Sequence, residues 1–115
     1  MQPNIIPLNQ TAPGPPANLA KPRNLYELWV EYQGRIAGNK AARLFSPQER
    51  GRVKSVYSKR KIVWDCILRL TAQGVFYNVA IDRIYAVYGQ NETVTNTINK
   101  MRADKIAGRI HVSLQ

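Results

Sequence analysis

Proline is distributed very unevenly along this chain, and the distribution limits where regular structure can form. Six of the seven prolines lie within residues 1–23, and the seventh is Pro47. Proline fixes φ and removes a backbone donor, so it interrupts both helices and sheets. We therefore expect residues 1–23 to be a proline-rich extended or disordered arm, residues 24–108 to be the folded domain, and residues 109–115 to be a short tail.

The residues after the arm carry apolar side chains at helical spacing and show no alternation long enough to build a sheet. In "NLYELWVEYQGRI", Asn24 is of the N-cap type and Glu27 occupies the capping-box position. Gly34 weakens the last turn, and Gly38 ends the helix. The apolar face of this predicted first helix consists of Leu25, Leu28, Trp29, Tyr32 and Ile36.

The run "SPQE" at residues 46–49 predicts the start of another helix, because serine caps, proline suits the first turn and glutamate returns the capping bond. Apolar residues then continue at helical spacing to a predicted stop at Gly74. A single continuous helix would place Arg60 on the apolar side, where an unpaired guanidinium is unfavourable. We therefore expect a break near residues 57–60, with Ser58 as a new N-cap.

Two further helices are predicted toward the C-terminus. The run "NVAIDRIYAVYG" ends at Gly89, and a helix over residues 94–107 ends at Gly108. The short connection "GQNE" makes this pair resemble a helix-turn-helix. The predicted fold class is therefore all-α, a small bundle of four to five helices with a helix-turn-helix-like C-terminal pair.

The composition argues against several classes of function. With one cysteine and one histidine, Cys66 and His111, the chain has too few ligands for a zinc finger and no pair for an internal disulfide. The seven acids are scattered, and no glycine loop has the spacing that cradles phosphates. No apolar run is long enough to span a membrane. We expect no enzyme activity, catalytic residues, metal, cofactor, small-molecule substrate or membrane partner.

Positive charge is concentrated in one part of the sequence. The formal net charge is +10, and residues 35–61 hold nine Lys or Arg against one acid, Glu49. Such clustering indicates an anionic partner, most often nucleic acid, although a solvated basic face is the simpler alternative. The stretch is also loosely bipartite, which predicts a nuclear location. The residues expected to contact DNA phosphates are Arg50, Arg52, Lys54, Lys59, Arg60 and Lys61.

The helix over residues 94–107 has the surface expected of a groove reader. With Val94, Ile98 and Met101 directed inward, its other face is polar or basic. Asparagine bonds to adenine, and arginine or lysine to guanine, at base edges in the major groove. A solvated helix face without contacts is the alternative. The residues expected to contact bases are Thr95, Asn96, Asn99, Lys100 and Arg102.

Three segments resemble a known family: "LYELWVEYQGRIAGNK", "YSKRKIVWDCILRL" and "VTNTINKMRADK". They are similar to the DNA-binding domain of the yeast transcriptional activator of glycolytic genes, a family also found in fungal stress-response activators, oomycete proteins and Crypton-type mobile elements. The resemblance covers about residues 24–107, and residues 57–61 match the family's basic-aromatic segment. It implies an all-helical domain of a transcription regulator or mobile-element protein that binds double-stranded DNA sequence-specifically. Residues 40–43 depart from it, since the yeast proteins have a proline-serine pair there.

Two other kinds of function remain compatible with the charge. One is an RNA-binding helical module, and the other is a helical domain that binds an acidic protein partner. RNA modules usually expose aromatic rings for stacking on bases. Trp29 and Trp64 fall on apolar faces here, which favours duplex DNA.

Overall fold

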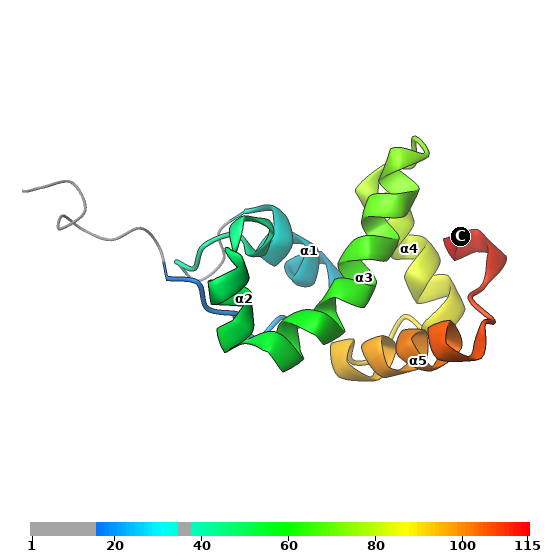
Figure 1. Ribbon diagram of the computed structural model, residues 1–115. Coiled ribbons are helices and arrows are strands. Elements are labelled where there is room, and N and C mark those ends of the chain that lie inside the picture. Colours follow the sequence, from blue (N-terminus) through cyan, green and yellow to red (C-terminus); the bar gives the residue numbers. More distant parts are fainter. Residues whose placement is uncertain (1–15, 35–37) are drawn as a thin grey trace, which may run out of the picture.

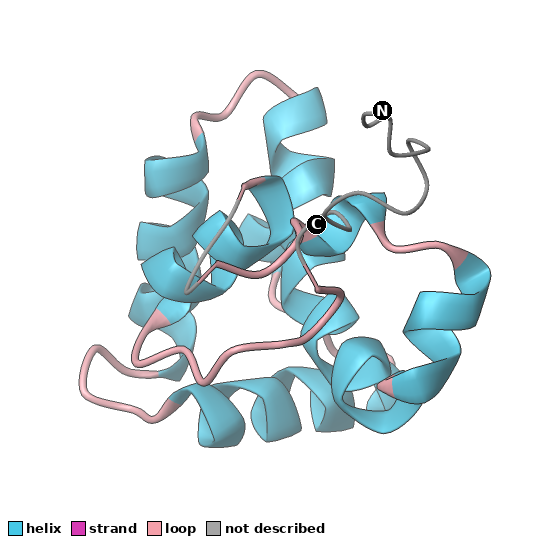
Figure 2. Ribbon diagram, turned by 90° about the vertical axis from the view of Figure 1, so that its left-hand side faces the viewer, coloured by secondary structure: helices cyan, strands magenta, loops and turns pink. Residues whose placement is uncertain are grey.

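The computed structural model describes residues 16–34 and 38–115. Within these residues the chain forms five α-helices and two short 3₁₀ turns, without any strand, so the predicted all-α fold is confirmed. Figure 2 shows the helices joined by loops. The elements are α1 (Leu25–Gln33), η2 (Ala42–Leu44), α2 (Pro47–Arg52), α3 (Lys54–Ala72), α4 (Tyr77–Tyr88), α5 (Val94–Ala107) and η3 (Val112–Leu114).

Helix α3 is the centre of the bundle, and α1, α2, α4 and α5 all contact it. Figure 1 shows α3 running diagonally through the molecule, with α5 lying below its upper half. Trp64, at the middle of α3, is fully buried and donates a hydrogen bond from Nε1 to the carbonyl of Leu28 at 2.9 Å. The core therefore forms around the apolar face of α3.

The helix starts follow the capping residues of the sequence. The Asn24 side chain accepts a hydrogen bond from the Glu27 N–H at 2.9 Å, but Glu27 turns to Arg23 instead of completing a capping box. Ser46 and Glu49 form the full reciprocal box, with bonds of 2.8 and 3.1 Å. The expected apolar contact of Ile36 lies outside the described residues.

The predicted helix break near residues 57–60 is wrong. The chain breaks earlier, at Val53, and α3 runs without interruption from Lys54 to Ala72, so Ser58 is not a cap. Arg60 does lie on the inner side of α3, as helical phase requires. Its guanidinium is paired there with Glu31 of α1, which removes the cost of burial on which the predicted break depended.

The last two helices meet at a tight connection. Gly89 ends α4 with φ of 116°, and the Thr93 side chain caps α5 by accepting a hydrogen bond from the Asn96 N–H at 3.1 Å. The Tyr88 hydroxyl donates to Asp104 of α5 at 2.7 Å, which ties the end of α4 to the last turn of α5. Gly108, with φ of 70°, ends α5 where the sequence predicted a stop.

The segments on either side of residues 24–108 contact the bundle where the structure describes them. The Lys40 N–H donates to the Pro16 carbonyl at 2.8 Å, and Leu19 packs against the core. At the other end, the Leu114 side chain is buried and its carbonyl accepts a hydrogen bond from Arg69 at 2.7 Å. The domain therefore includes residues that the predicted boundaries assigned to the arm and the tail.

Candidate nucleic-acid interface

Ion pairs decide which of the positive charges are available to a partner. Among the residues that the structure describes, six of the seven acids pair with one cation each. The seventh, Asp82, accepts a hydrogen bond from the Tyr26 hydroxyl at 3.3 Å. The pairs are Arg23–Glu27 (2.6 Å), Lys40–Glu49 (2.8 Å), Arg60–Glu31 (2.6 Å), Lys61–Asp65 (2.7 Å), Lys100–Glu92 (2.6 Å) and Arg109–Asp104 (3.4 Å).

Three more arginines are held by backbone carbonyls: Arg43 by Gln33, Arg69 by Leu114, and Arg83 by Ser113. Seven cations then have neither an ion pair nor a hydrogen bond to any residue that the structure describes. They are Lys21, Arg50, Arg52, Lys54, Lys59, Arg102 and Lys105.

The expected phosphate contacts divide into two groups. Arg50, Arg52, Lys54 and Lys59 belong to the unpaired cations, with the Arg50 guanidinium 6.0 Å from the centre of the Tyr57 ring. Arg60 differs from expectation, because its side chain is only 13% exposed and is bound to Glu31. Lys61 is exposed but paired with Asp65 one turn along α3. Adjacent basic residues of one helix thus point to different environments.

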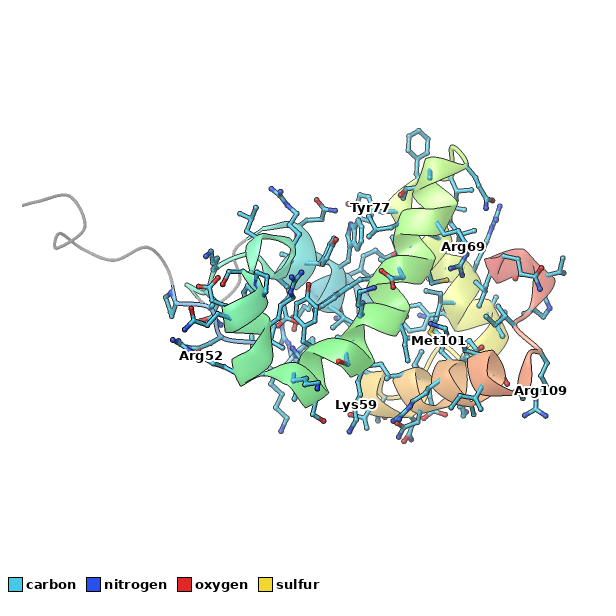
Figure 3. The ribbon with its side chains drawn as sticks, in the orientation of Figure 1. Arg52, Lys59, Arg69, Tyr77, Met101 and Arg109 are labelled. Carbon is cyan, nitrogen blue, oxygen red and sulfur yellow. The ribbon has the colours of Figure 1, made fainter. Side chains whose placement is uncertain are left out.

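Three of the unpaired cations meet between α3 and α5. Lys54 and Lys59 of α3 and Arg102 of α5 line a hollow of about 430 Å³, together with Ser55 and Ser58. Figure 3 shows Lys59 at the lower edge of α3, next to α5. Arg102, which was expected to contact bases, therefore lies beside the residues expected to contact phosphates, and no pattern in the sequence indicates this.

Lys59 also lines a second hollow, of about 520 Å³, at the first turns of α5. Thr95 and Asn99 border it from α5, and Lys21 borders it from the segment before α1. Because Lys59 lines both hollows, they lie side by side on the surface. Arg23, Arg60 and Thr93 of the lining are held by other residues of the domain. We call the rest of the polar lining the Lys59 face, which consists of Lys21, Lys54, Ser55, Ser58, Lys59, Thr95, Asn99 and Arg102.

The polar side of α5 is partly occupied by an acid of its own turn. Ile98 and Met101 are buried as predicted, with Val94 half-buried. Glu92 accepts hydrogen bonds from the Asn96 amide at 2.9 Å and the Lys100 ammonium at 2.6 Å. These bonds lower the pKa of the Glu92 carboxyl to about 2.

The structure therefore divides the residues expected to contact bases. Asn96 and Lys100 are bound to Glu92. Thr95, Asn99 and Arg102 are exposed, and their side chains make no hydrogen bond within the described residues. Two of these three border the hollow at the start of α5, and Arg102 borders the other.

Aromatic side chains lie away from the Lys59 face. Trp64 packs edge-on against Tyr57 and beside Tyr32, with ring centres 5.2 and 5.1 Å apart. The most exposed rings are Phe76 and Tyr77, at 78% and 48% exposure, at the junction of α3 and α4. Figure 3 shows Tyr77 on the side of α3 opposite Lys59. The basic surface thus lacks the exposed rings on which unpaired bases stack.

The described residues hold no group of three His, Cys, Asp or Glu that is placed to bind a metal ion. None of the helices that the structure describes is long and apolar enough to cross a membrane. Cys66 is buried beside the C-terminal tail, and burial raises the pKa of its thiol.

Comparisons of the chain with models of protein families, with curated proteins and with solved structures give no match.

Proposed function

We propose that this chain is a sequence-specific double-stranded DNA-binding domain of a transcription regulator or mobile-element protein that acts in the nucleus. The cations of the Lys59 face, including Arg102, bind phosphates together with Arg50 and Arg52 of α2. Helix α5 presents Thr95 and Asn99 to base edges in the major groove. The observation that carries the proposal is the convergence of unpaired cations beside the polar side of α5. Lys21, Lys54, Lys59 and Arg102 come from three segments of the chain to two neighbouring hollows.

The two parts of this surface have different tasks. Lysine and arginine contacts to phosphates supply affinity and fix the position of a protein on the duplex, and side-chain contacts to base edges supply sequence preference. The cations on α3 are presented by a helix that is fixed to α1 through Trp64 and Arg60. Helix α5 also packs on α3. The phosphate-binding cations of α3 therefore keep a fixed position relative to the base-contacting residues of α5.

Two observations favour duplex DNA over the other polyanions. The described aromatic rings are buried or lie away from the basic surface, which disfavours the stacking used by single-stranded RNA modules. Asn99 is exposed and lines the same hollow as Lys59. An asparagine that shares a surface with phosphate-binding cations is suited to bond to an adenine edge. An acidic protein partner would pair with the cations but would leave Asn99 without a role.

A salt titration of duplex affinity tests the proposal. Six contacts, from Lys21, Arg50, Arg52, Lys54, Lys59 and Arg102, give an expected log–log slope of about −5, at about −0.9 per contact. The variant Lys59→Ala/Arg102→Ala removes two unpaired cations, so its slope should be shallower by about 2. A slope for the parent shallower than about −2 would contradict phosphate binding by this surface.

A matched control removes the same number of charges elsewhere. Lys61→Ala/Arg109→Ala changes two cations that are paired with Asp65 and Asp104. Figure 3 shows Arg109 at the end of α5 that is far from Lys59. This control should keep most of the slope of the parent. Equal loss in the two double variants would show that net charge, rather than the Lys59 face, determines binding.

A further inference from the structure

Ser55 occupies an unusual position on the Lys59 face. It lies in the first turn of α3, is exposed, and lines the hollow of about 430 Å³ together with Lys54, Lys59 and Arg102. No acidic residue lines this hollow. A negative group attached to Ser55 would therefore enter a site that already holds three positive charges.

The sequence before Ser55 reads "RGRVKS", with arginines five and three residues upstream. Kinases that select basic substrates recognise such arginines through carboxylates in the substrate groove, because guanidinium and carboxylate pair in a bidentate way. Arg50 and Arg52 have no ion pair within the described residues, so both are available for this recognition.

The local structure permits a kinase to reach the site. Helix α2 has no buried residue, and the first three residues of α3 are all exposed. Tyr57 is the first side chain of α3 that belongs to the core. Val53 is half-buried against the core, so opening of residues 47–56 exposes this one apolar contact and little else. Segments of this kind open at low free-energy cost.

We propose that Ser55 is a phosphorylation site for a protein kinase of the arginine-directed class, and that its phosphate turns off duplex binding. The second half of this statement rests on the proposed function. In the reaction, the Ser55 Oγ attacks the γ-phosphorus of ATP, and the bond from that phosphorus to the bridging oxygen breaks. ADP leaves, and the hydroxyl proton passes to the catalytic base of the kinase.

The added phosphate acts on binding and on stability in opposite directions. It carries a charge of about −1.5 to −2 at neutral pH and pairs with lysine or arginine, so it neutralises Lys59 and Arg102 and repels DNA. It also lies at the start of α3, where Val53 provides no side-chain cap. Negative charge in a first helical turn stabilises the helix, so the phosphorylated domain should be more stable and bind DNA less tightly.

The site is tested by incubating the full chain with ATP and an arginine-directed kinase and locating the phosphate by mass spectrometry. We expect one phosphate on Ser55 in the parent and in the Ser58→Ala control. Ser55→Ala should take up none, and Arg50→Ala/Arg52→Ala should take up far less. Phosphate on Ser58 instead, or no phosphate on the parent, would overturn the assignment of the site.

The switch is tested on the phosphorylated protein. Its affinity for duplex DNA at 0.1 M salt should fall about 10- to 100-fold, since two lost phosphate contacts remove about 0.9 log unit each at that salt. Its melting temperature should rise. An unchanged affinity, with a parent that binds duplex DNA, would overturn the switch alone. A parent that does not bind duplex DNA would overturn the proposed function and the switch together, and would leave the site to be judged by mass spectrometry.

Discussion

The Arg60 guanidinium contacts both oxygens of the Glu31 carboxylate, at 2.6 and 2.8 Å, and thereby joins the first half of α3 to α1. Glu31 is only 1% exposed, and its Oε2 also accepts a hydrogen bond from the Ala20 N–H at 2.9 Å. Burial raises the pKa of the Glu31 carboxyl, and Arg60 limits that rise. The pair connects the segment before α1, α1 itself and α3, so it supports the helix from which Lys54 and Lys59 project.

Removal of one partner of this pair should destabilise the domain strongly. Glu31→Gln leaves a guanidinium largely buried without its counter-charge, and we expect a loss of about 3 kcal/mol in the free energy of unfolding. The double variant Glu31→Leu/Arg60→Met replaces both charges by apolar groups and should recover much of that loss. Urea unfolding of the parent, the single variant and the double variant measures these free energies. If Glu31→Gln changes stability by less than about 0.5 kcal/mol, the pair does not stabilise the fold.

Release of Lys100 from Glu92 should strengthen binding to all duplexes. Glu92→Gln removes the carboxylate that holds the ammonium at 2.6 Å. One additional phosphate contact steepens the salt slope by about 0.9 and raises affinity for random duplex about 8-fold at 0.1 M salt. The preference for the selected site over random duplex should fall.

Asp65→Asn makes the same change of charge and releases Lys61 from its partner on α3. Its effect on duplex affinity should be smaller, because Lys61 lies on α3, whereas Lys100 lies on α5, the helix proposed to enter the groove. If Glu92→Gln and Asp65→Asn raise duplex affinity equally, the gain in affinity comes from net charge and not from the release of Lys100.

Acid should weaken the fold partly through Glu92. Its carboxyl has a pKa of about 2 in the folded chain, against 4.5 for an ordinary glutamate, so folding favours the ionised form. The stabilisation is present above pH 4.5 and is lost as the pH falls from 4.5 toward 2. Melting temperatures measured from pH 7 to pH 2.5 should fall less steeply in Glu92→Gln than in the parent. Parallel curves would show that Glu92 does not contribute.

Asn99 should affect sequence preference more than Asn96. Asn99→Ala should lose about 1–3 kcal/mol on the selected site, because an exposed asparagine bonds directly to adenine. Affinity for random duplex should barely change, because phosphate contacts supply it. Asn96→Ala should lose less, since its amide donates to Glu92.

A different placement of the domain makes a different prediction. If the first half of α3 enters the groove instead of α5, Lys59→Ala will change the sequence preference and Asn99→Ala will not. Titrations of Asn96→Ala, Asn99→Ala and Lys59→Ala on selected and random duplexes distinguish these arrangements.

The parts of the fold that depend on neighbouring residues could be predicted from the sequence. Ser46 and Glu49 are three residues apart and form the expected capping box. Gly108 ends α5, and the buried positions of Ile98 and Met101 follow from helical spacing. Each of these features is set within about one turn of helix.

The parts that depend on distant residues could not. Helical phase placed Arg60 on the inner side of α3, but its partner Glu31 lies 29 residues away on another helix. Without that partner, a helix break was the reasonable prediction. Ion pairs also decide which residues of the candidate site are available to DNA. Lys100 is bound to Glu92, which lies eight residues earlier in the chain. Lys21 carried no pattern that would place it beside Asn99.

The central claim is that this domain recognises a particular sequence of double-stranded DNA. Selection from randomised duplexes, followed by titration at about 0.15 M salt, tests it most directly. Specific sites are typically bound 10³-fold or more tightly than random DNA. We predict a ratio of about this size for the selected duplex over a scrambled duplex, a single-stranded RNA of equal length and an acidic polymer. Equal affinity for the four, or tighter binding of the RNA, would contradict the account.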